Sequence, residues 1–341
     1  MAMTALKHKD CPASNPAASP LDRLAALLEG EMDATNAAIL ARARSHIPLI
    51  PQVAEYLIAA GGKRIRPLLT LAAANLFGGA PGAPGLAAAV EFIHTATLFH
   101  DDVIDESAQR RGKPAANLVF GNKAAVLVGD FLFGRAFEMM VETDDLRILA
   151  ILSRAARVMS EGEVLQMSLT GDIDITIDQY RDIIDAKTAA LFSGAAESGA
   201  LLAGCDDTGA AAMRDYGYHL GMAFQMIDDL MDYTGRTAKM GKESGDDFRE
   251  GKMTLPVILA IGSADDEERA FWTRTMQAHD QTPADLETAR ALIAQHDAVS
   301  RGRDIARDHA ARARAALAPC PQCELRGVLE DVLDFVVARD H

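Results

Sequence analysis

Apolar residues recur with the period of an α-helix along almost the whole chain. The pattern covers residues 21–43, 53–60, 66–77, 86–106, 123–141, 146–169, 178–203 and 208–233, and shorter stretches continue to residue 337. Segments rich in glycine or proline separate these stretches, and only the tetrapeptide DITI from Asp174 alternates as a strand does. Long helices joined by short connections predict an all-α fold, with the helices packed as an antiparallel bundle in a single domain.

The boundaries of that domain follow from composition. The 341 residues contain no linker-like segment, so we expect one domain over residues 21–341. Residues 1–20 are rich in alanine, proline and serine, and we expect them to form a disordered leader. No apolar run approaches the roughly 18 residues of a membrane-spanning helix, which predicts a cytoplasmic protein. The net charge of −15 argues against a nucleic-acid groove, because phosphate backbones require clustered lysine and arginine.

Two of the helical stretches end in a cluster of carboxylates. The clusters share the spacing DDxxD and consist of Asp101, Asp102 and Asp105, and of Asp228, Asp229 and Asp232. Residues four apart point to the same side of a helix, so two carboxylates of each cluster face the same way. Like charges at that spacing destabilise a helix by roughly 0.2–0.5 kcal/mol. A solvated helix end would tolerate one such cluster, but its recurrence after a second apolar helix indicates a functional site.

The carboxylates form an all-oxygen cage if the two helices face each other across the bundle. Oxygen ligands suit Mg²⁺, which keeps several waters and bridges a few carboxylates to substrate phosphates. Ca²⁺ is the competing ion, but the EF-hand loop pattern is absent around both clusters and in the segment that begins at Asp172. The sequence therefore favours magnesium together with a diphosphate ligand.

A diphosphate also requires basic or polar donors, and the chain carries several beside glycine-rich turns or just after the aspartates. They are Lys63, Arg64 and Arg66 in GGKRIRP, Arg110 and Arg111 in QRRGKP, Lys187 and Thr188 in DAKTA, and Lys242 and Lys252 in MGKESGDDFREGK. Each taken alone is more often a surface charge than a ligand. The cysteine pair Cys320 and Cys323 lacks both a second pair for zinc and a βαβ context for redox chemistry, so we interpret it as incidental.

In their order along the chain, these motifs resemble those of the trans-isoprenyl (polyprenyl) diphosphate synthases, in particular the long-chain octaprenyl and decaprenyl type. The resemblance runs through GGKRIRPLL, HTATLFHDDVIDESAQRRGKPAAN, VLVGDFLFGRAF, SEGEVLQM, KTAALF, GMAFQMIDDLMDY and GDDFREGKMTLP, and covers roughly residues 20–340. It implies a homodimer with the isoprenoid synthase type of helical bundle and a central substrate cavity. The implied activity is the Mg²⁺-dependent addition of isopentenyl diphosphate to an allylic diphosphate, repeated to build the side chain of ubiquinone.

The resemblance also implies a role for each motif residue. Asp101, Asp105 and Asp228 would bind magnesium ions, three when substrate is present, and Asp102, Asp229 and Asp232 would support them. The allylic diphosphate, farnesyl or geranyl, would be held by Arg110, Lys187, Thr188, Gln225, Lys242 and Lys252. Isopentenyl diphosphate would be held by Lys63, Arg66, His94 and Arg111. Alternatively, His94 is a core residue whose ring nitrogens are hydrogen-bonded within the protein. The six aspartates and Lys187 form the expected catalytic set.

Two small residues, Ala96 and Thr97, precede the first aspartate cluster by about one helical turn. In the family an aromatic residue at this level is associated with short products, so we expect the growing tail to pass it towards residues 123–141. The expected tail pocket consists of Phe92, Ile93, Ala96, Thr97, Phe133 and Phe137, with one of the last two as its floor. Alternatively, Ala96 is small only because two helices cross closely there.

Other interpretations stay open. A terpene cyclase or a head-to-head synthase shares the fold, but the second intact aspartate cluster and the motifs for a second diphosphate argue against them. A shorter-chain synthase, making farnesyl or geranylgeranyl diphosphate, differs only in product length. A non-catalytic regulatory subunit of a heteromeric synthase would be expected to lack one aspartate cluster. For a polyprenyl diphosphate synthase, the expected partners include a membrane surface, contacted peripherally during product release.

Overall fold

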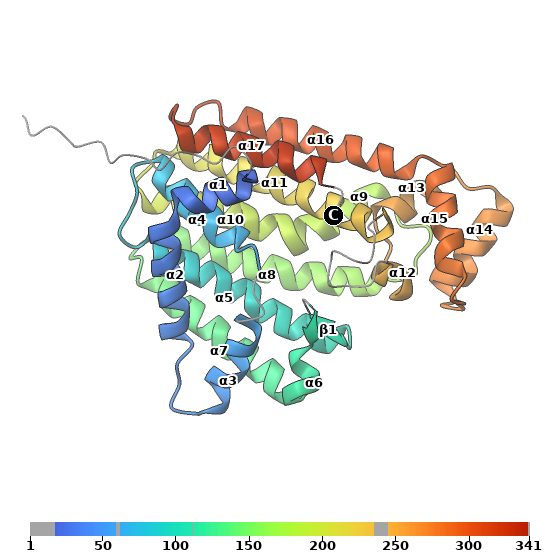
Figure 1. The fold of residues 1–341 in the computed structure, drawn as a ribbon, viewed down its shortest axis with the longest axis horizontal. Helices are drawn as coiled ribbons and strands as arrows, with labels where there is room; N and C mark the ends of the chain where they lie inside the picture. The colour runs from blue at the N-terminus through green and yellow to red at the C-terminus, as the bar shows by residue number, and fades with distance from the viewer. Residues whose placement is uncertain (1–17, 59–61, 111, 235–244, 340–341) are drawn as a thin grey trace, which may run out of the picture.

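Helices dominate the computed structural model, which describes residues 18–58, 62–110, 112–234 and 245–339 (Figure 1). They are α1 (Pro20–Leu27), α2 (Glu29–Arg42), α3 (Leu49–Ile58), α4 (Ile65–Leu76), α5 (Ala83–Ile104), α6 (Ala116–Phe120), α7 (Asn122–Val141), α8 (Leu146–Leu169), α9 (Ile177–Ile184), α10 (Ala190–Leu202), α11 (Asp207–Thr234), α12 (Asp246–Arg249), α13 (Leu255–Ile261), α14 (Asp266–Trp272), α15 (Asp285–Gln295), α16 (Ala298–Ala316) and α17 (Glu324–Ala338). Two π-helical segments, η1 (Asp185–Ala189) and η2 (Thr273–Gln277), continue α9 and α14. The prediction of an all-α fold is confirmed.

Helix α10 joins the two halves of the hydrophobic core. On one side, its Leu191 and Ala195 belong to a buried cluster that includes side chains of α2, α5, α7 and α8. On the other side, its Phe192 and Ala196 belong to a second cluster, which includes side chains of α4, α11, α13, α16 and α17. In Figure 1, α5, α7 and α8 lie below α10, and α11, α16 and α17 lie above it. Helix α10 is therefore buried on both sides, and its apolar, alanine-rich sequence suits that position.

Two glycines allow the helices around this core to pack closely. A β-carbon at Gly199 of α10 would lie 2.2 Å from the carbonyl oxygen of Thr70 on α4, and one at Gly129 of α7 would lie 2.3 Å from His100 Nε2 on α5. At Gly199 the obstacle is backbone, so any side chain there would push α10 away from α4. At Gly129 the obstacle is the imidazole of His100, so a side chain there would displace that ring. Helix α5 carries the first aspartate cluster, and the GGKRIRP motif leads into α4.

The short β-structure is not where the sequence alternates. The DITI segment leads from a turn into α9, which begins at Ile177, and its Thr176 caps that helix through reciprocal hydrogen bonds with Gln179. The two strands that do form, β1 (Gln109–Arg110) and β2 (Lys113–Pro114), pair in an antiparallel hairpin within QRRGKP. Strands of two residues are too short to leave an alternating pattern in the sequence.

Most helix boundaries differ from the prediction by a few residues, and three of the differences bear on the fold. The stretch 21–43 is divided at Leu28, where α1 ends and α2 begins. The stretch 178–203 contains the π-helical segment η1, which carries Lys187 and Thr188. The first helix begins at Pro20 and is capped by Ser19, so the last two residues of the expected leader belong to the fold. Residues 1–17 lie outside the described residues. In the ranges that the structure describes, no helix is both long and apolar enough to span a membrane.

Candidate active site

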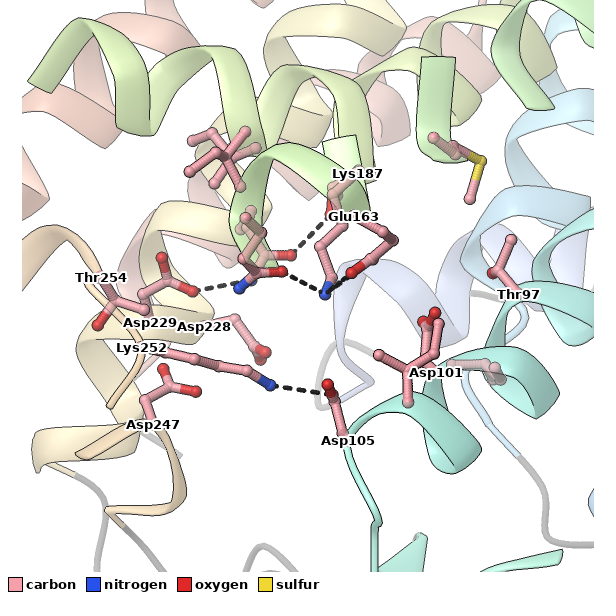
Figure 2. Close-up of a pocket in the computed structure, with 18 of the residues that line it drawn as sticks. Thr97, Asp101, Asp105, Glu163, Lys187, Asp228, Asp229, Asp247, Lys252 and Thr254 are labelled. Carbon is pink, nitrogen blue, oxygen red and sulfur yellow. Dashed lines mark hydrogen bonds and ion pairs between the residues drawn. The ribbon is translucent and has the colours of Figure 1, made fainter. Parts of the chain in front are cut away.

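A cavity of about 1660 Å³ lies between the ends of α4, α5, α8, α9 and α11. Both aspartate clusters contribute to its wall, as do residues of the segment 246–254 that includes α12. Figure 2 shows Asp101 and Asp105 on one side of this space and Asp228 and Asp229 on the other. The expected central cavity is present, and the two clusters face each other across it.

The aspartates of the first cluster have different surroundings. Asp101 and Asp105 line the cavity. Asp102 does not line it; its side chain is fully buried and lies 2.6 Å from Arg110 Nη2 in an ion pair. Arg110 belongs to β1, so this ion pair fastens the hairpin to the end of α5. The backbone carbonyl of Asp102 also accepts a hydrogen bond from Asn117 Nδ2 at 2.9 Å.

The charge on Asp101 is disfavoured by its surroundings. Burial and the neighbouring carboxylates of Glu163 and Asp105 raise the pKa of Asp101 to about 7. A cation beside the carboxylate would favour its charged form. Among the described residues, no group of three or more aspartate, glutamate, histidine or cysteine side chains could hold a metal ion by itself. The site therefore fits Mg²⁺ bound through one or two carboxylates, with substrate phosphates and water as its other ligands.

We expect Mg²⁺ and inorganic pyrophosphate together to raise the melting temperature by more than the sum of their separate effects, and more so near pH 8 than near pH 6. The pKa of Asp101 is raised from its usual value of 3.8 to about 7 in the folded protein. Between pH 3.8 and about pH 7, the folded protein therefore binds this proton more tightly than the unfolded chain does. This group's contribution to stability therefore falls as pH rises through that window, and a bound cation would restore it. Thermal melting curves at the two pH values test this, and additive or pH-independent shifts would contradict it.

Asp229 of the second cluster is held by two side-chain donors. Tyr180 Oη donates to its Oδ2 at 2.6 Å, and Gln225 Nε2 donates to its Oδ1 at 2.8 Å. The hydroxyl of Thr188 donates to Gln225 Oε1 at 2.8 Å, so the network continues into η1. Burial raises the pKa of Asp229 to about 7, and these hydrogen bonds act in the opposite direction. Asp229, which lines the cavity, thereby links α9, η1 and α11 at the cavity wall.

Asp228 and Asp232, the other two aspartates of this cluster, differ from each other as Asp101 and Asp102 do in the first cluster. Asp228 lines the cavity. Asp232 does not, and its two carboxylate oxygens accept the backbone N–H groups of Gly245 and Asp247 at 3.1 Å each. This residue therefore anchors the start of α12 to the end of α11. In each cluster, one carboxylate that does not line the cavity holds the next segment of the chain in place.

Two lysines in the cavity pair with carboxylates from other elements (Figure 2). Lys187 Nζ lies 2.8 Å from Glu163 Oε1 and 2.8 Å from Gln166 Oε1, both on α8. Lys252 Nζ lies 3.0 Å from Asp105 Oδ2 and 2.5 Å from Glu250 Oε2. Burial alone would lower the pKa of Lys252, but these two carboxylates raise it above the usual value. Lys252 therefore joins the first aspartate cluster to the segment that follows the second.

Lys63, Arg66 and His94, predicted for the second diphosphate, line the same cavity. Lys63 Nζ lies 5.9 Å from the ring centroid of Phe335 on α17. Burial, together with the nearby guanidinium of Arg339, lowers the pKa of Lys63. Arg339 itself lines the cavity just after the end of α17. Arg339 is thus a further cation at the site, contributed by the residue that follows α17.

Sequence reasoning missed several residues of this site. Five of them are Glu163, Gln166, Tyr180, Asp247 and Arg339. The first two lie within SEGEVLQM and Asp247 lies within GDDFREGK, so the motifs that carried the resemblance already contained a signal for them. Tyr180 and Arg339 stand outside any quoted motif, and only the folded chain brings them to the cavity. Arg111 and Lys242 lie outside the residues whose side chains the structure describes.

Only some of the residues predicted for the tail pocket line the cavity. Thr97 and Phe133 line the cavity, and so does Met159 of α8. Phe92, Ile93 and Ala96 are fully buried in the core cluster around α5 and are not among the residues that line the cavity. The side chain of Phe137 is 40% exposed, on the outer side of α7. Of the two floor candidates, Phe133 is the one at the cavity wall.

Comparison with known proteins agrees with this geometry. The family model for polyprenyl synthetase matches residues 47–293. The chain belongs to this family. The polyprenyl synthetase is 42% identical to the octaprenyl diphosphate synthase of Escherichia coli (strain K12) over 321 residues, which are 94% of this chain and 99% of that one.

Solved structures of polyprenyl synthetases share the fold. The decaprenyl diphosphate synthase from Rhodobacter capsulatus is 51% identical, with a TM-score of 0.91, over 94% of this chain and 100% of that one. A polyprenyl synthase from Caulobacter crescentus CB15, complexed with calcium and isoprenyl diphosphate, is 52% identical, with a TM-score of 0.91, over 94% and 98% of the two chains. The resemblance stated from the sequence motifs is confirmed.

Proposed function

We propose that this polyprenyl synthetase is a long-chain all-trans-polyprenyl diphosphate synthase. The observation that carries the proposal is one cavity in which two aspartate clusters face each other and to which at least four basic side chains contribute, those of Lys63, Arg66, Lys187 and Lys252. A cavity of about 1660 Å³ has room for two diphosphates and a long apolar tail. The similar enzymes support octaprenyl or decaprenyl diphosphate as the product.

The residues divide between the two substrates. Lys187, Thr188, Gln225 and Lys252, with Arg110 and Lys242, hold the allylic diphosphate, and Lys63, Arg66, His94 and Arg111 hold isopentenyl diphosphate. Asp101, Asp105 and Asp228 would hold Mg²⁺. The bound ions would stabilise the negative charge that develops on the departing diphosphate. We assign three ions to the loaded site. Farnesyl or geranyl diphosphate serves as the primer.

Each addition follows from this placement. The C–O bond of the allylic diphosphate breaks, its electron pair leaves with the diphosphate, and an allylic cation remains. The double bond of isopentenyl diphosphate attacks the cation, and a proton passes to the released diphosphate as a new trans double bond forms. The reaction requires that water be kept from the cation, because water would otherwise trap it. The product is one isoprene unit longer and retains a diphosphate for the next addition.

The alternatives are less well supported. A regulatory subunit would not require both aspartate clusters in one cavity, where Asp101 has a pKa raised to about 7. A shorter-chain synthase would require a barrier close to the aspartates, whereas Thr97 leaves the cavity open as far as Phe133 and Met159. We also infer a cytoplasmic enzyme that supplies the side chain of ubiquinone and contacts the membrane peripherally when the product leaves.

The proposed activity is tested with the purified protein, labelled isopentenyl diphosphate, farnesyl diphosphate and Mg²⁺. Chromatography of the dephosphorylated products should give one long all-trans alcohol of octaprenyl or decaprenyl length. Omission of Mg²⁺, or addition of a chelator, should abolish the product. Products that stop at the geranylgeranyl stage would favour the shorter-chain alternative. No product with farnesyl diphosphate, or with geranyl diphosphate in its place, would favour the regulatory subunit.

We further infer that the enzyme is a homodimer. Among the described residues, the large apolar side chains that are exposed all lie between Leu40 and Met167. Several of them belong to α6, α7 and α8: Leu118, Val119, Leu127, Phe137, Val141, Val164 and Met167. Leu127, Phe137 and Val141 project within about 80° of one another around α7. An apolar surface of this kind suits a second copy of the chain.

Leu127→Glu is expected to convert the dimer to a monomer. Leu127 is 67% exposed, so the substitution costs little in the monomer but would bury a charge in the dimer. Light scattering coupled to size-exclusion chromatography measures the mass. Ala311→Glu, on the exposed side of α16, is the matched control and should leave the mass unchanged. An unchanged mass for Leu127→Glu would remove α7 from the interface.

A further inference from the structure

Arg64 has a backbone conformation that arginine rarely adopts. Its φ and ψ angles are 48° and 37°, in the left-handed region, at the N-terminal cap of α4. Glycine adopts this conformation without strain, whereas a residue with a β-carbon does not. An arginine at such a position suggests that its side chain makes a contact that offsets the strain.

That contact is an ion pair with Glu91 of α5. Arg64 Nη1 lies 2.5 Å from Glu91 Oε1, and the two side chains are 16% and 6% exposed. Both residues line the cavity. Removing one partner of such a buried pair leaves the other charge uncompensated, so each ion depends on the other. The pair fastens the start of α4 to α5, about one helical turn before His94.

In the sequence, Arg64 lies between Lys63 and Arg66, which are assigned to isopentenyl diphosphate binding under the proposed function. Lys63 and Arg66 also line the cavity, and the guanidinium carbon of Arg66 lies 4.7 Å from the ring centroid of Phe192. The charge of Arg64 is matched by that of Glu91. The carboxylate of Glu91 is an anion in the wall of a cavity that must receive a second anion. Without Arg64, it would repel a diphosphate held by Lys63 and Arg66.

We propose that Arg64 is a positioning residue for isopentenyl diphosphate. It sets the turn between Lys63 and Arg66 through its pair with Glu91, and it neutralises the carboxylate that would oppose the ligand. Arg64 acts through these neighbours and does not touch the diphosphate. The inference rests on the proposed function, which assigns this part of the cavity to isopentenyl diphosphate.

Steady-state kinetics with both substrates varied separates positioning from a general structural role. Arg64→Met leaves Glu91 charged and unpaired, so KM for isopentenyl diphosphate should rise about tenfold or more. The KM for the allylic diphosphate and kcat should each change by less than about twofold. Arg64→Met/Glu91→Gln also removes the repelling charge, and should recover most of the loss. The control Arg42→Met breaks a more exposed ion pair with Glu142 and should change neither KM.

Three results would overturn the inference: equal increases in both KM values, a loss confined to kcat, or a double variant no better than Arg64→Met. Arg64→Lys keeps the charge and gives a second test if Arg64→Met does not fold. Its KM for isopentenyl diphosphate should stay within about threefold of the wild type, and a tenfold rise would count against charge neutralisation.

Calorimetric titration with isopentenyl diphosphate reports on the same variants without turnover. The expected order of affinity is wild type, Arg64→Lys, the double variant and Arg64→Met, and equal affinities would overturn the inference. A wild-type protein that binds isopentenyl diphosphate but condenses nothing would overturn the proposed function alone. The two failures are therefore distinguishable.

Discussion

Asp101→Asn is expected to lower the rate of condensation by at least about a thousandfold while leaving the protein folded. Asp101 lines the cavity, and burial together with the carboxylates of Glu163 and Asp105 raises its pKa to about 7. Its charge is therefore unfavourable without a cation, and a neutral amide of the same shape removes that cost. Without Mg²⁺, the variant should melt at the wild-type temperature or slightly above it near pH 8. Single-turnover rates and thermal melting measure the two effects.

An exposed aspartate provides the control for this substitution. The side chain of Asp178 on α9 is 86% exposed and forms an ion pair with Arg181 of its own helix. Asp178→Asn should therefore retain full activity and should respond to Mg²⁺ as the wild type does. Turnover near the wild-type rate in Asp101→Asn would remove this carboxylate from the metal site.

Thr97→Phe is expected to change the product from a long chain to one of about three or four isoprene units, with condensation retained. Thr97 lines the cavity on the same wall as Asp101, so a ring at this position fills the space that the tail must enter. The sequence pointed to both Thr97 and its neighbour Ala96, but Ala96 is fully buried in the core. We expect Ala96→Phe to cost roughly 1–3 kcal/mol of stability through overpacking. Product chromatography and thermal melting compare the two variants.

Phe137→Ala is the control for product length. Phe137 is 40% exposed on α7 and is not among the residues that line the cavity, so its truncation should leave the product unchanged. A full-length product from a folded and active Thr97→Phe enzyme would show that the tail does not pass this wall. A shortened product from Ala96→Phe, with normal stability, would place the tail on the other side of α5.

The helices were predictable because their apolar faces repeat over many residues. The stretch 146–169 coincides with α8, and 123–141 differs from α7 by one residue. The hairpin of β1 and β2 was not predictable, since each strand has two residues and is fixed by tertiary contacts such as the pair of Arg110 with Asp102. The π-helical turn at Lys187 was not predictable either, because one turn of five residues is too short to change the apolar periodicity of the helices around it.

The candidate site was predictable where residue types repeat in a motif. Both aspartate clusters and Lys187 lie at the cavity or directly behind it, as the motifs indicated. The different surroundings within a cluster were not predictable, because DDxxD does not reveal that Asp102 and Asp232 bind protein groups. Arg339 follows α17 by one residue and reaches the cavity only because that helix packs against α11 and α4. Contacts of that sequence separation leave no local pattern.

Several of the cavity's basic groups already have anionic neighbours: Arg110 has Asp102, Lys187 has Glu163, and Lys252 has Asp105. A diphosphate entering this site would exchange partners with protein carboxylates, and the same carboxylates would take back the cations when inorganic diphosphate departs. Such an exchange makes both arrival and departure smaller steps in free energy than binding to solitary cations would be. The enzyme must release a diphosphate after every addition while the growing hydrocarbon chain stays bound. After each release, the basic side chains would return to their protein carboxylates, and the site would be ready for the next addition.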